Sequence, residues 1–406
     1  MDNQILQVSQ SESSDSEFPP AIGKEISLPT DLSLINFIEE NYYGTTIKQW
    51  YDWKWQIINS ITDTEKLIKL LGKKKNGTII NMPKNHLPFR ITPHFVHLLD
   101  SLPSDHPLYK TIIPTINELN SCDGEKEDPL DEQKNSPVPN IVHRYPDRAL
   151  FLVTNFCSTY CRYCTRSHMV SKENNINATK AEWEKGFEYI ENNPIIRDVI
   201  VSGGDPLTLR DDQIEYILSR LRSIKHVEII RLGTKVPVVL PMRITSELTN
   251  ILKRYHPLYM SIHFTHPDEL TEETQKACNM LADAGVQMLS QTVLLKDIND
   301  NIDVMKKLMH KLLVMRVKPY YLYQMDRIPG GEHFRAPIST GLNIINGLAG
   351  YTSGLAVPKY IVDSVLGKID ISSAYNILDF NGKIYNLKSF NGEILNYPEK
   401  EYSYPL

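Results

Sequence analysis

The sequence predicts an α/β fold built from parallel βαβ units, because β-rich runs alternate with amphipathic helical patterns after residue 147. The β-rich runs are Ala149–Thr154, Asp198–Ser202, Val227–Leu232, Tyr259–Phe264, Met288–Leu295 and Tyr320–Met325. The helical patterns are Ala181–Asn192, Gln213–Ser223, Ser246–Tyr255, Glu269–Ala284 and Ile302–Val317. Strands roughly 30 residues apart, each followed by a helix, indicate a parallel sheet that is doubly wound or closed into a complete or partial barrel. In both arrangements, functional side chains collect at the carboxyl ends of the strands.

The regions outside these units differ in composition and in hydrophobic pattern. We expect a disordered arm over residues 1–30, because its first twenty residues are rich in Ser, Asp and Glu and end in two prolines. A helical region over 31–145 follows, with apolar residues at helical spacing and a loop-rich stretch from Ser121 to Pro139. The α/β part covers 146–350. Residues 351–406 form a small α+β C-terminal region with a strand-like run at Tyr360–Val362 and hairpin turns at Asn381-Gly382 and Asn391-Gly392.

Composition narrows the class of protein. The net charge of -5 over 406 residues does not favour a nucleic-acid partner. The sequence contains no stretch of eighteen or more apolar residues, so we expect no membrane-spanning helix. The N-terminus lacks the pattern of a secretory signal. Five cysteines, three of them within eight positions, do not make a disulfide framework. We therefore expect a cytoplasmic protein with no membrane partner.

Three cysteines follow the first predicted strand in one loop: Cys157, Cys161 and Cys164. Thiolates at this density indicate zinc or an iron–sulfur cluster. Structural zinc requires four protein ligands, and the remaining cysteines, Cys122 and Cys278, stand alone. The pattern favours a [4Fe–4S] cluster with one open iron. An electron carrier and a zinc-binding interaction module remain as alternatives.

A second motif, Gly203-Gly204-Asp205, ends the second predicted strand. Two glycines permit close backbone approach, and the carboxylate can accept a hydrogen bond from an ammonium group. This motif is a common turn by itself, but its place after a cysteine loop indicates a cofactor site.

These motifs resemble those of radical S-adenosylmethionine (SAM) enzymes, in which CxxxCxxC follows the first barrel strand. The segments RYPDRALFLVT, CSTYCRYCTR, SGGDPL, VPVVLPMRIT, HFTHPDEL, EHFRAPIS and GYTSGLAVP are similar to the lysine 2,3-aminomutase family, from Tyr51 to residue 399. The resemblance implies a partial (β/α)6 TIM-like barrel of the radical SAM type. It implies a [4Fe–4S] cluster that cleaves SAM to a 5′-deoxyadenosyl radical, and pyridoxal phosphate (PLP) that lets an α-amino group migrate to the β-carbon.

The resemblance also assigns roles at matching positions. Arg166 matches the arginine that pairs with the substrate carboxylate, and Arg148 matches an arginine at the PLP phosphate. The remaining matches are Gly203, Gly204 and Asp205 at the SAM amino group, His263 and Gln291 near SAM, and Asp326 and Asp363 at the ε-ammonium of lysine. From residue type alone, the arginines could be ordinary salt-bridge residues, Asp363 a capping residue and His263 a core histidine.

Lys368 is the expected PLP lysine, although its loop departs from the family pattern. The segment Asp363–Lys368 is two residues shorter than the family loop and has one glycine, so its path must differ. If Lys368 does not hold PLP, either Lys359 does or PLP is not used. No cysteine follows Cys278, so the structural zinc of some family members is not expected.

The expected function is an aminomutase acting on a cationic amino acid, because the resemblance places two acids, Asp326 and Asp363, at the distal end of the site. L-Lysine is the first choice and arginine the alternative. A glutamate-specific variant would need a positive group there, and a relative that modifies a translation factor would lack much of the flanking sequence. A PLP-independent radical SAM enzyme is the remaining rival. We also expect a reductant such as flavodoxin or ferredoxin, and a homo-oligomer.

Overall fold

The computed structural model describes residues 32–71, 86–120, 122–170, 178–372, 377–380, 384–389 and 392–398. The arm expected over residues 1–30 lies outside them. The chain divides into two compact units, Met1–Gly44 and Thr45–Leu406. In the first unit, the described residues form helix α1 (Leu32–Asn41), which buries Leu34, Phe37 and Ile38 at the expected helical spacing.

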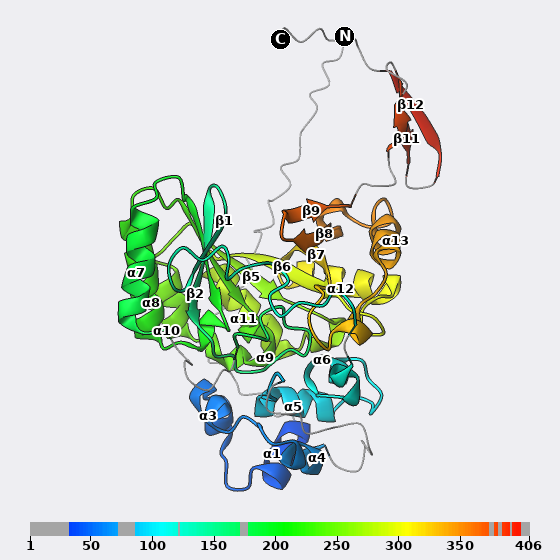
Figure 1. Ribbon diagram of the computed structural model, residues 1–406. Coiled ribbons are helices and arrows are strands. Elements are labelled where there is room, and N and C mark those ends of the chain that lie inside the picture. Colours follow the sequence, from blue (N-terminus) through cyan, green and yellow to red (C-terminus); the bar gives the residue numbers. More distant parts are fainter. Residues whose placement is uncertain are drawn as a thin grey trace, which may run out of the picture. The chain divides into compact units, whose positions relative to one another are not determined.

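The second unit contains a sheet whose strands follow one another in chain order (Figure 1). Nine described strands form it: β1 (Ile141–Tyr145), β2 (Arg148–Thr154), β3 (Asp198–Gly203), β4 (Ile229–Thr234), β5 (Leu258–His263), β6 (Gln287–Leu294), β7 (Lys318–Gln324), β8 (Lys359–Ser364) and β9 (Gly367–Asp370). Strands β2 to β8 are parallel, and β1 and β9 pair antiparallel at the two edges. The sheet is nearly closed and barrel-like, so the predicted radical SAM fold is confirmed.

The sheet differs from the prediction at its last strand. The run expected as part of a separate C-terminal region, Tyr360–Val362, is the middle of β8, which pairs in parallel with β7. The parallel sheet therefore continues past the expected boundary at residue 350. The edge strands β1 and β9 were not predicted, because neither has a clear strand pattern in its sequence. They become strands by pairing with β2 and β8.

Helices cover the outer face of this sheet. The described helices of this part are α7 (Lys180–Glu191), α8 (Asp211–Ser223), α9 (Val236–Val239), α10 (Ser246–Leu252), α11 (Glu272–Asp283), α12 (Ile302–Val314) and α13 (Ile338–Leu348). Helix α7 packs on β2, where the rings of Phe151 and Phe187 meet edge to face with centroids 5.2 Å apart. A Cβ on Gly186 would come within 2.8 Å of the Phe151 ring, so this packing requires glycine. The five predicted helices match α7, α8, α10, α11 and α12, whereas α9 and α13 were not predicted.

The strands bury their outward side chains and expose their inward ones. Strand β4 alternates between partly exposed and fully buried residues, with Ile230 and Leu232 beneath the helices. Strand β6 alternates in the same way. This pattern arises because the helices seal the outside of the barrel, whereas its interior is hollow and polar.

A helical region precedes the sheet. It contains α2 (Ile47–Trp50), α3 (Trp53–Ile58), α4 (Thr64–Leu70), α5 (Pro93–Asp100) and α6 (Leu108–Ile112). The guanidinium of the fully buried Arg243 lies 4.4 Å from the centroid of the Trp53 ring and donates to the carbonyl of Leu207. The Thr92 hydroxyl donates to the Val239 carbonyl at 2.6 Å. These contacts join the helical region to the loops that follow β3 and β4.

The C-terminal segment forms a small antiparallel sheet of β10 (Ile377–Phe380), β11 (Ile384–Lys388) and β12 (Ile394–Pro398). Its order agrees with the two predicted hairpins, although Asn381, Gly382 and Asn391 lie outside the described residues. Among the described helices, none combines the length and the apolarity needed to cross a membrane.

Candidate active site

A cavity of about 340 Å³ lies inside the barrel, lined by side chains from its strands. From β3 it takes Asp198, Ile200 and Ser202, and from β4 it takes Arg231 and Gly233. Seven of the residues singled out from the sequence line this cavity: Arg148, Arg166, His263, Gln291, Asp326, Asp363 and Lys368. The site therefore extends along the barrel axis and is not confined to the strand ends. Arg148 is a case in point, because it is the first residue of β2 and not its last.

The three cysteines lie in the loop that follows β2. Burial raises the pKa of the Cys157 thiol, and nearby Asp205, Cys164 and Cys161 raise it further. Burial and then Cys161 raise the pKa of Cys164 to about 11. Metal binding requires thiolates, so a cationic cluster must supply the free energy that ionises these partly buried thiols. Three soft sulfur donors that interact within one loop fit an iron–sulfur cluster.

Gly203 and Gly204 pack against the start of the cysteine loop. A Cβ on Gly203 would lie 2.1 Å from the Thr154 carbonyl oxygen, and one on Gly204 would lie 2.3 Å from that of Phe156. Gly203 also has a φ of +132°, which favours glycine. The close approach expected at these glycines is therefore to the backbone just before Cys157, and it fixes where the cysteine loop begins.

Asp205 joins the ends of β3 and β4. Its carboxylate accepts hydrogen bonds from the Thr234 hydroxyl at 2.7 Å and from the backbone amides of Lys235, Leu207 and Val236. A carboxylate offers about four acceptor positions, and these donors fill them. In this structure the carboxylate holds the loop after β4 in place, so an ammonium group would have to displace one of these donors.

Arg166 is held by an acid that the sequence analysis did not identify. Its Nε and Nη2 both donate to the Glu132 carboxylate, each at 2.7 Å. Glu132 comes from the loop-rich stretch before β1, which the pattern marked only as a connection. The pairing is a bidentate fork, which fixes the plane of the guanidinium. Nη1 is the nitrogen left to meet a ligand.

Asp326 and Asp363 face the same cavity but differ in their partners. Asp326 follows β7 and accepts from the Thr165 hydroxyl at 2.5 Å. Burial raises its pKa to about 6, and the negative charge of Asp363 adds to that effect. Asp363 instead pairs with Arg144 at 2.8 Å and with Lys368 at 2.6 Å. Within the described residues, no lysine or arginine forms an ion pair with Asp326.

Lys368 lies directly across a hairpin from Asp363. Strands β8 and β9 are joined by the two-residue turn Val365-Leu366, and the register pairs Asp363 with Lys368. Gly367, at a φ of +108°, carries the left-handed conformation that the turn requires. The shortened loop is therefore a tight hairpin that directs Lys368 into the cavity. Lys359 pairs with Asp370, has a side chain 65% exposed and does not line the cavity.

Aromatic rings and further cations complete this side of the cavity. The Lys368 ammonium lies 5.9 Å from the Tyr145 ring centroid and 5.6 Å from that of Tyr323. The Arg148 guanidinium lies 4.1 Å from the Tyr145 ring. Arg231 also lines the cavity and pairs with Asp198. A lysine, flat rings and cations suit a planar aldehyde that carries a phosphate, so these residues fit PLP.

His263 and Gln291 lie at neighbouring positions on β5 and β6. Burial lowers the pKa of His263 to about 4, and the positive charges of Lys235 and Arg166 contribute. The imidazole is therefore neutral at physiological pH and can act as a hydrogen-bond donor or acceptor. Both side chains line the cavity, on the part of the sheet between the cysteine loop and β7.

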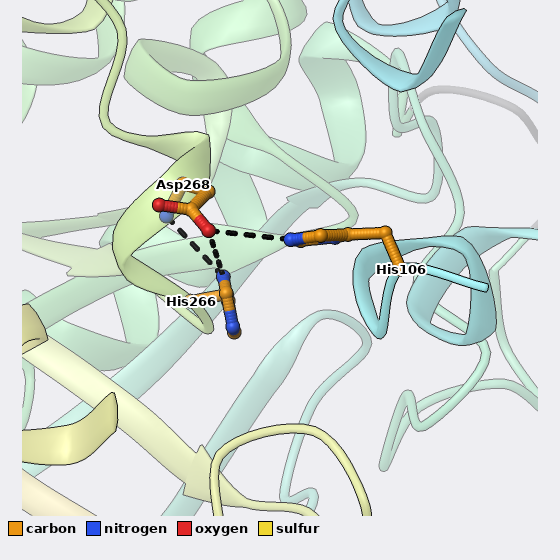
Figure 2. A group of neighbouring side chains, drawn as sticks. All are labelled: His106, His266 and Asp268. Atoms are coloured by element: carbon orange, nitrogen blue, oxygen red, sulfur yellow. Dashed lines mark hydrogen bonds and ion pairs between the residues drawn. The ribbon is translucent and has the colours of Figure 1, made fainter. Parts of the chain in front are cut away.

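A separate group of potential metal ligands lies at the contact between the helical region and the loop after β5. Figure 2 shows His106, His266 and Asp268 together, with His106 Nε2 3.2 Å from Asp268 Oδ2. The Leu108 amide donates to Nδ1 of His106 and the Asp268 amide to Nδ1 of His266, while the Lys307 ammonium lies 3.3 Å from Asp268. The Nδ1 lone pairs and the carboxylate are thus already engaged. We assign this group to joining the two regions and not to binding a metal.

Comparison with known proteins shows the family of this chain. The radical SAM superfamily model matches residues 151–309, and the lysine-2,3-aminomutase model matches residues 345–405. The chain belongs to the lysine 2,3-aminomutase family of radical SAM enzymes. It is 46% identical to the L-lysine 2,3-aminomutase of Fusobacterium nucleatum, over 82% of this chain and 78% of the relative. It is 45% identical to that of Clostridium subterminale, over 86% and 85% respectively.

Membership of this family confirms the predicted enzyme class and two of the predicted cofactors. The protein is an isomerase of the aminomutase type, and its cofactors include a [4Fe–4S] cluster and SAM. The electron-carrier and zinc-module alternatives are thereby set aside. The family also contains a glutamate 2,3-aminomutase from Clostridioides difficile, 42% identical over 83% of this chain and 78% of the relative. Membership of the family therefore does not identify the substrate by itself, and the choice rests on the residues that line the cavity.

The residues that sequence reasoning missed share one property: they are partners of the predicted ones. Glu132 orients Arg166, Arg144 pairs with Asp363, and Thr165 bonds Asp326. Thr165 was the easiest to find, because it lies between the last cysteine and Arg166. Arg144 begins the segment RYPDRALFLVT, but nothing in that segment indicates its pairing with Asp363. Glu132 had no signal in the sequence, since its role follows from the tertiary contact.

Proposed function

We propose that this protein is a PLP-dependent L-lysine 2,3-aminomutase, which moves the α-amino group of L-lysine to the β-carbon to give a β-amino acid. The single observation that carries the choice of a cationic substrate is Asp326. Its carboxylate lies in the cavity with the Thr165 hydroxyl as its hydrogen-bond partner, and its pKa is raised to about 6 by burial. Among the described residues, no lysine or arginine pairs directly with this partly buried carboxylate; Lys368 and Arg166 act on it only at longer range. The ε-ammonium of lysine would supply a direct partner and offset the cost of burial.

The opposite end of the substrate would meet Arg166. Glu132 occupies Nε and Nη2 of this arginine, so Nη1 is directed to the substrate carboxylate. Arg166 and Asp326 interact electrostatically across the cavity. A positive group at one end and a negative group at the other match an amino acid with a cationic side chain. A glutamate side chain would place like charges together at Asp326.

We propose that Lys368 holds PLP covalently and that Arg148 binds its phosphate. When bound, PLP supplies a conjugated system that stabilises an unpaired electron beside the migrating nitrogen. The chain's own residues position this lysine: Asp363, which also pairs with Arg144, binds the Lys368 ammonium, and Tyr145 accepts from the Lys368 amide at 2.9 Å. Because the hairpin holds Lys368 by backbone as well as side chain, the lysine is placed before any cofactor binds.

We propose that Gly203, Gly204, Asp205, His263 and Gln291 form the SAM side of the cavity, next to Cys157, Cys161 and Cys164. The neutral His263 and the amide of Gln291 can bond SAM without adding charge. A reductant such as flavodoxin or ferredoxin would deliver the electron. We further propose a cytoplasmic location, because the cluster thiols need a reducing compartment. We also propose that the protein is a homo-oligomer.

Arginine is the second candidate substrate, and one observation favours it. A larger hollow of about 930 Å³ adjoins the cavity and shares Asp326 and Asp363 with it. A guanidinium side chain longer than that of lysine could extend past the two aspartates into this space. Its lining includes Asn117 and Asn120, which can accept from a guanidinium through their amide oxygens.

The test is an anaerobic incubation of the reconstituted enzyme with SAM, PLP, dithionite and either L-lysine or L-arginine, followed by separation of α- and β-amino products. The proposal predicts β-lysine as the main product, and Asp326→Asn should lose most of it. β-Arginine in larger yield would transfer the assignment to the second candidate. If no β-amino acid formed from either substrate while SAM was cleaved, PLP-dependent amino migration would be ruled out.

A further inference from the structure

A buried ion pair that the proposed function does not use ties the cysteine loop to the helical region. Arg162, which precedes Tyr163 in that loop, has a side chain 0% exposed. Its Nε and Nη2 both donate to the Glu118 carboxylate, with Nη2 2.6 Å from Oε2. Its Nη1 donates to the Pro88 carbonyl at 2.8 Å, and its backbone amide donates to the Thr111 carbonyl at 2.9 Å. The guanidinium and the backbone of Arg162 are therefore both held by residues that precede the sheet.

The backbone of Glu118 contacts a second loop, the one that follows β7. A Cβ on Gly330 would lie 2.4 Å from the Glu118 carbonyl oxygen, and Gly330 has a φ of +72°, so this contact requires glycine. Gly330 lies in the loop that begins with Asp326. Nearby, the Lys126 amide donates to the Arg327 carbonyl at 2.9 Å. Glu118 therefore contacts both loops: its side chain holds the cysteine loop, and its backbone meets the loop that carries Asp326.

These two loops carry the partners of the hydrogen-atom transfer. SAM, the source of the radical, would bind at the cluster held by the cysteine loop, and Asp326 would hold the side chain of the substrate. A misplacement of about 1 Å between reacting groups can lower a rate about a hundredfold. An apolar core that includes Tyr163, Met325 and Ile328 also joins the loops. Apolar contacts have no preferred direction, however, whereas hydrogen bonds do.

We propose that Glu118 is a positioning residue that fixes the cysteine loop relative to the loop carrying Asp326, and so sets the distance between radical and substrate. Because Asp326 is taken as the anchor of the substrate, this role of Glu118 rests on the proposed function. The fork between a carboxylate and a guanidinium admits one geometry, so it fixes direction as well as distance. Replacing a buried ion pair by apolar residues is often neutral for stability, so the pair can be removed without unfolding the chain.

The first test is amide hydrogen exchange, measured by mass spectrometry on the full-length, cluster-loaded protein without SAM, PLP or substrate. The reporter is the amide of residue 162, which is bonded to the Thr111 carbonyl. The double variant Glu118→Leu with Arg162→Met should speed its exchange roughly tenfold, because the ion pair that holds the loop is gone. Gly330→Ala should also speed it, although residue 330 lies in the other loop. Adding Gly330→Ala to the double variant should give no further increase.

The second test is the ratio of 5′-deoxyadenosine released to β-lysine formed in the complete reaction with L-lysine. A displaced radical misses the β-carbon and takes a hydrogen atom from another C–H or S–H bond of protein or buffer. The 5′-deoxyadenosine then leaves, and SAM is not re-formed. This ratio should rise roughly tenfold in Gly330→Ala and in the double variant. A mere loss of folded enzyme would lower both products alike and leave the ratio unchanged.

Asp211→Asn is the matched control, because Asp211 begins helix α8 and pairs at 2.7 Å with Arg243, another arginine with a fully buried side chain. It should change neither the exchange nor the ratio. Unchanged exchange at residue 162 in Gly330→Ala would overturn the role of Glu118, as would effects that add in the combined variant. An unchanged ratio while the parent makes β-lysine would also overturn it.

A failure of the proposed function would look different, because the parent itself would then form no β-lysine. In that case the exchange at residue 162 decides alone whether Glu118 links the two loops. If the double variant did not load the cluster, Gly330→Ala would decide, since it leaves the ion pair between Arg162 and Glu118 chemically intact.

Discussion

The cavity has two walls that are built in different ways: the cysteine loop, which lines it through Tyr163, Thr165 and Arg166, and the β8–β9 hairpin. The cysteine wall is held by the backbone: Gly203 and Gly204 pack against Thr154 and Phe156, and Asp205 binds three amides. The wall formed by the β8–β9 hairpin is held by side-chain ion pairs around Asp363 and ends in a turn whose Leu366 is 89% exposed. The first wall is rigid around a fixed cluster, whereas the second can exchange the partners of Lys368. That difference suits one cofactor that stays in place and a second cofactor that must bond first to Lys368 and then to the substrate.

The largest effect is expected at the cysteine wall. Cys161→Ser removes a soft sulfur donor, so the iron content of the reconstituted protein should fall sharply and SAM cleavage should be lost. Elemental analysis and the release of 5′-deoxyadenosine measure both. Cys278→Ser, in buried helix α11, is the control and should retain the cluster. A fully loaded, active Cys161→Ser protein would contradict the assignment of this wall.

The second effect tests the hairpin wall. Lys368→Ala should abolish covalent PLP, since no amine would remain in the cavity at that position, while the iron content stays normal. Borohydride reduction in the presence of PLP, followed by peptide mapping, reads out the modified lysine. Lys359→Ala, on the exposed side of β8, should leave the modification at residue 368 unaffected. Labelling of Lys359 in the parent protein would show that the hairpin was assigned wrongly.

A smaller effect is expected for substrate affinity. Asp326→Asn keeps the hydrogen bond with Thr165 but removes the negative charge, so the KM for L-lysine should rise by roughly 10- to 100-fold, or about 1.4–2.8 kcal/mol. In the parent protein, affinity for lysine should also fall as the pH drops through about 6, where Asp326 becomes protonated. Steady-state kinetics between pH 5 and 8 would show both. A KM that did not respond to either change would place the ε-ammonium elsewhere.

The smallest effect concerns stability without substrate. The pKa of Asp326 in the folded protein, about 6, is above its ordinary value of 3.8. The folded state therefore binds more protons than the unfolded state between these values, and this carboxyl lowers stability as the pH rises through that window. Asp326→Asn should raise the melting temperature by a few degrees at pH 7 and by little near pH 4. A lower melting temperature at pH 7 would mean that attraction from nearby cations such as Lys368 and Arg166 outweighs the cost of burying the Asp326 charge.

The two walls also differ in how far sequence alone could describe them. The cysteine wall was predictable, because thiol spacing and the glycine pair are local patterns with few alternative chemistries. Even there, the glycines directly contact the backbone of Thr154 and Phe156, which no pattern reveals. The βα alternation predicted six of the seven parallel strands in place, since each strand and helix carries its own periodicity.

The hairpin wall was only partly predictable, because its key contacts are made across the sheet. The spacing of Asp363 and Lys368 did not show that they face each other, since this depends on the register of β8 and β9. Glu132 and Arg144 come from segments more than 30 and 200 residues away from their partners. Strand β1, which carries Arg144, lies at the opposite edge of the sheet from β8 and β9. Arg144 reaches Asp363 only because the sheet curves until its two edges nearly meet.

One labelling experiment tests the central claim most directly: that the two walls act on one lysine molecule between them. The holoenzyme is incubated anaerobically with SAM, PLP and L-lysine deuterated at C3, and both the recovered SAM and the amino acids are analysed by mass spectrometry. The account predicts deuterium in the 5′-deoxyadenosyl group of SAM together with β-lysine, with β-lysine lost in Lys368→Ala. Deuterium transfer without β-lysine, or β-lysine formed equally by Lys368→Ala, would contradict it.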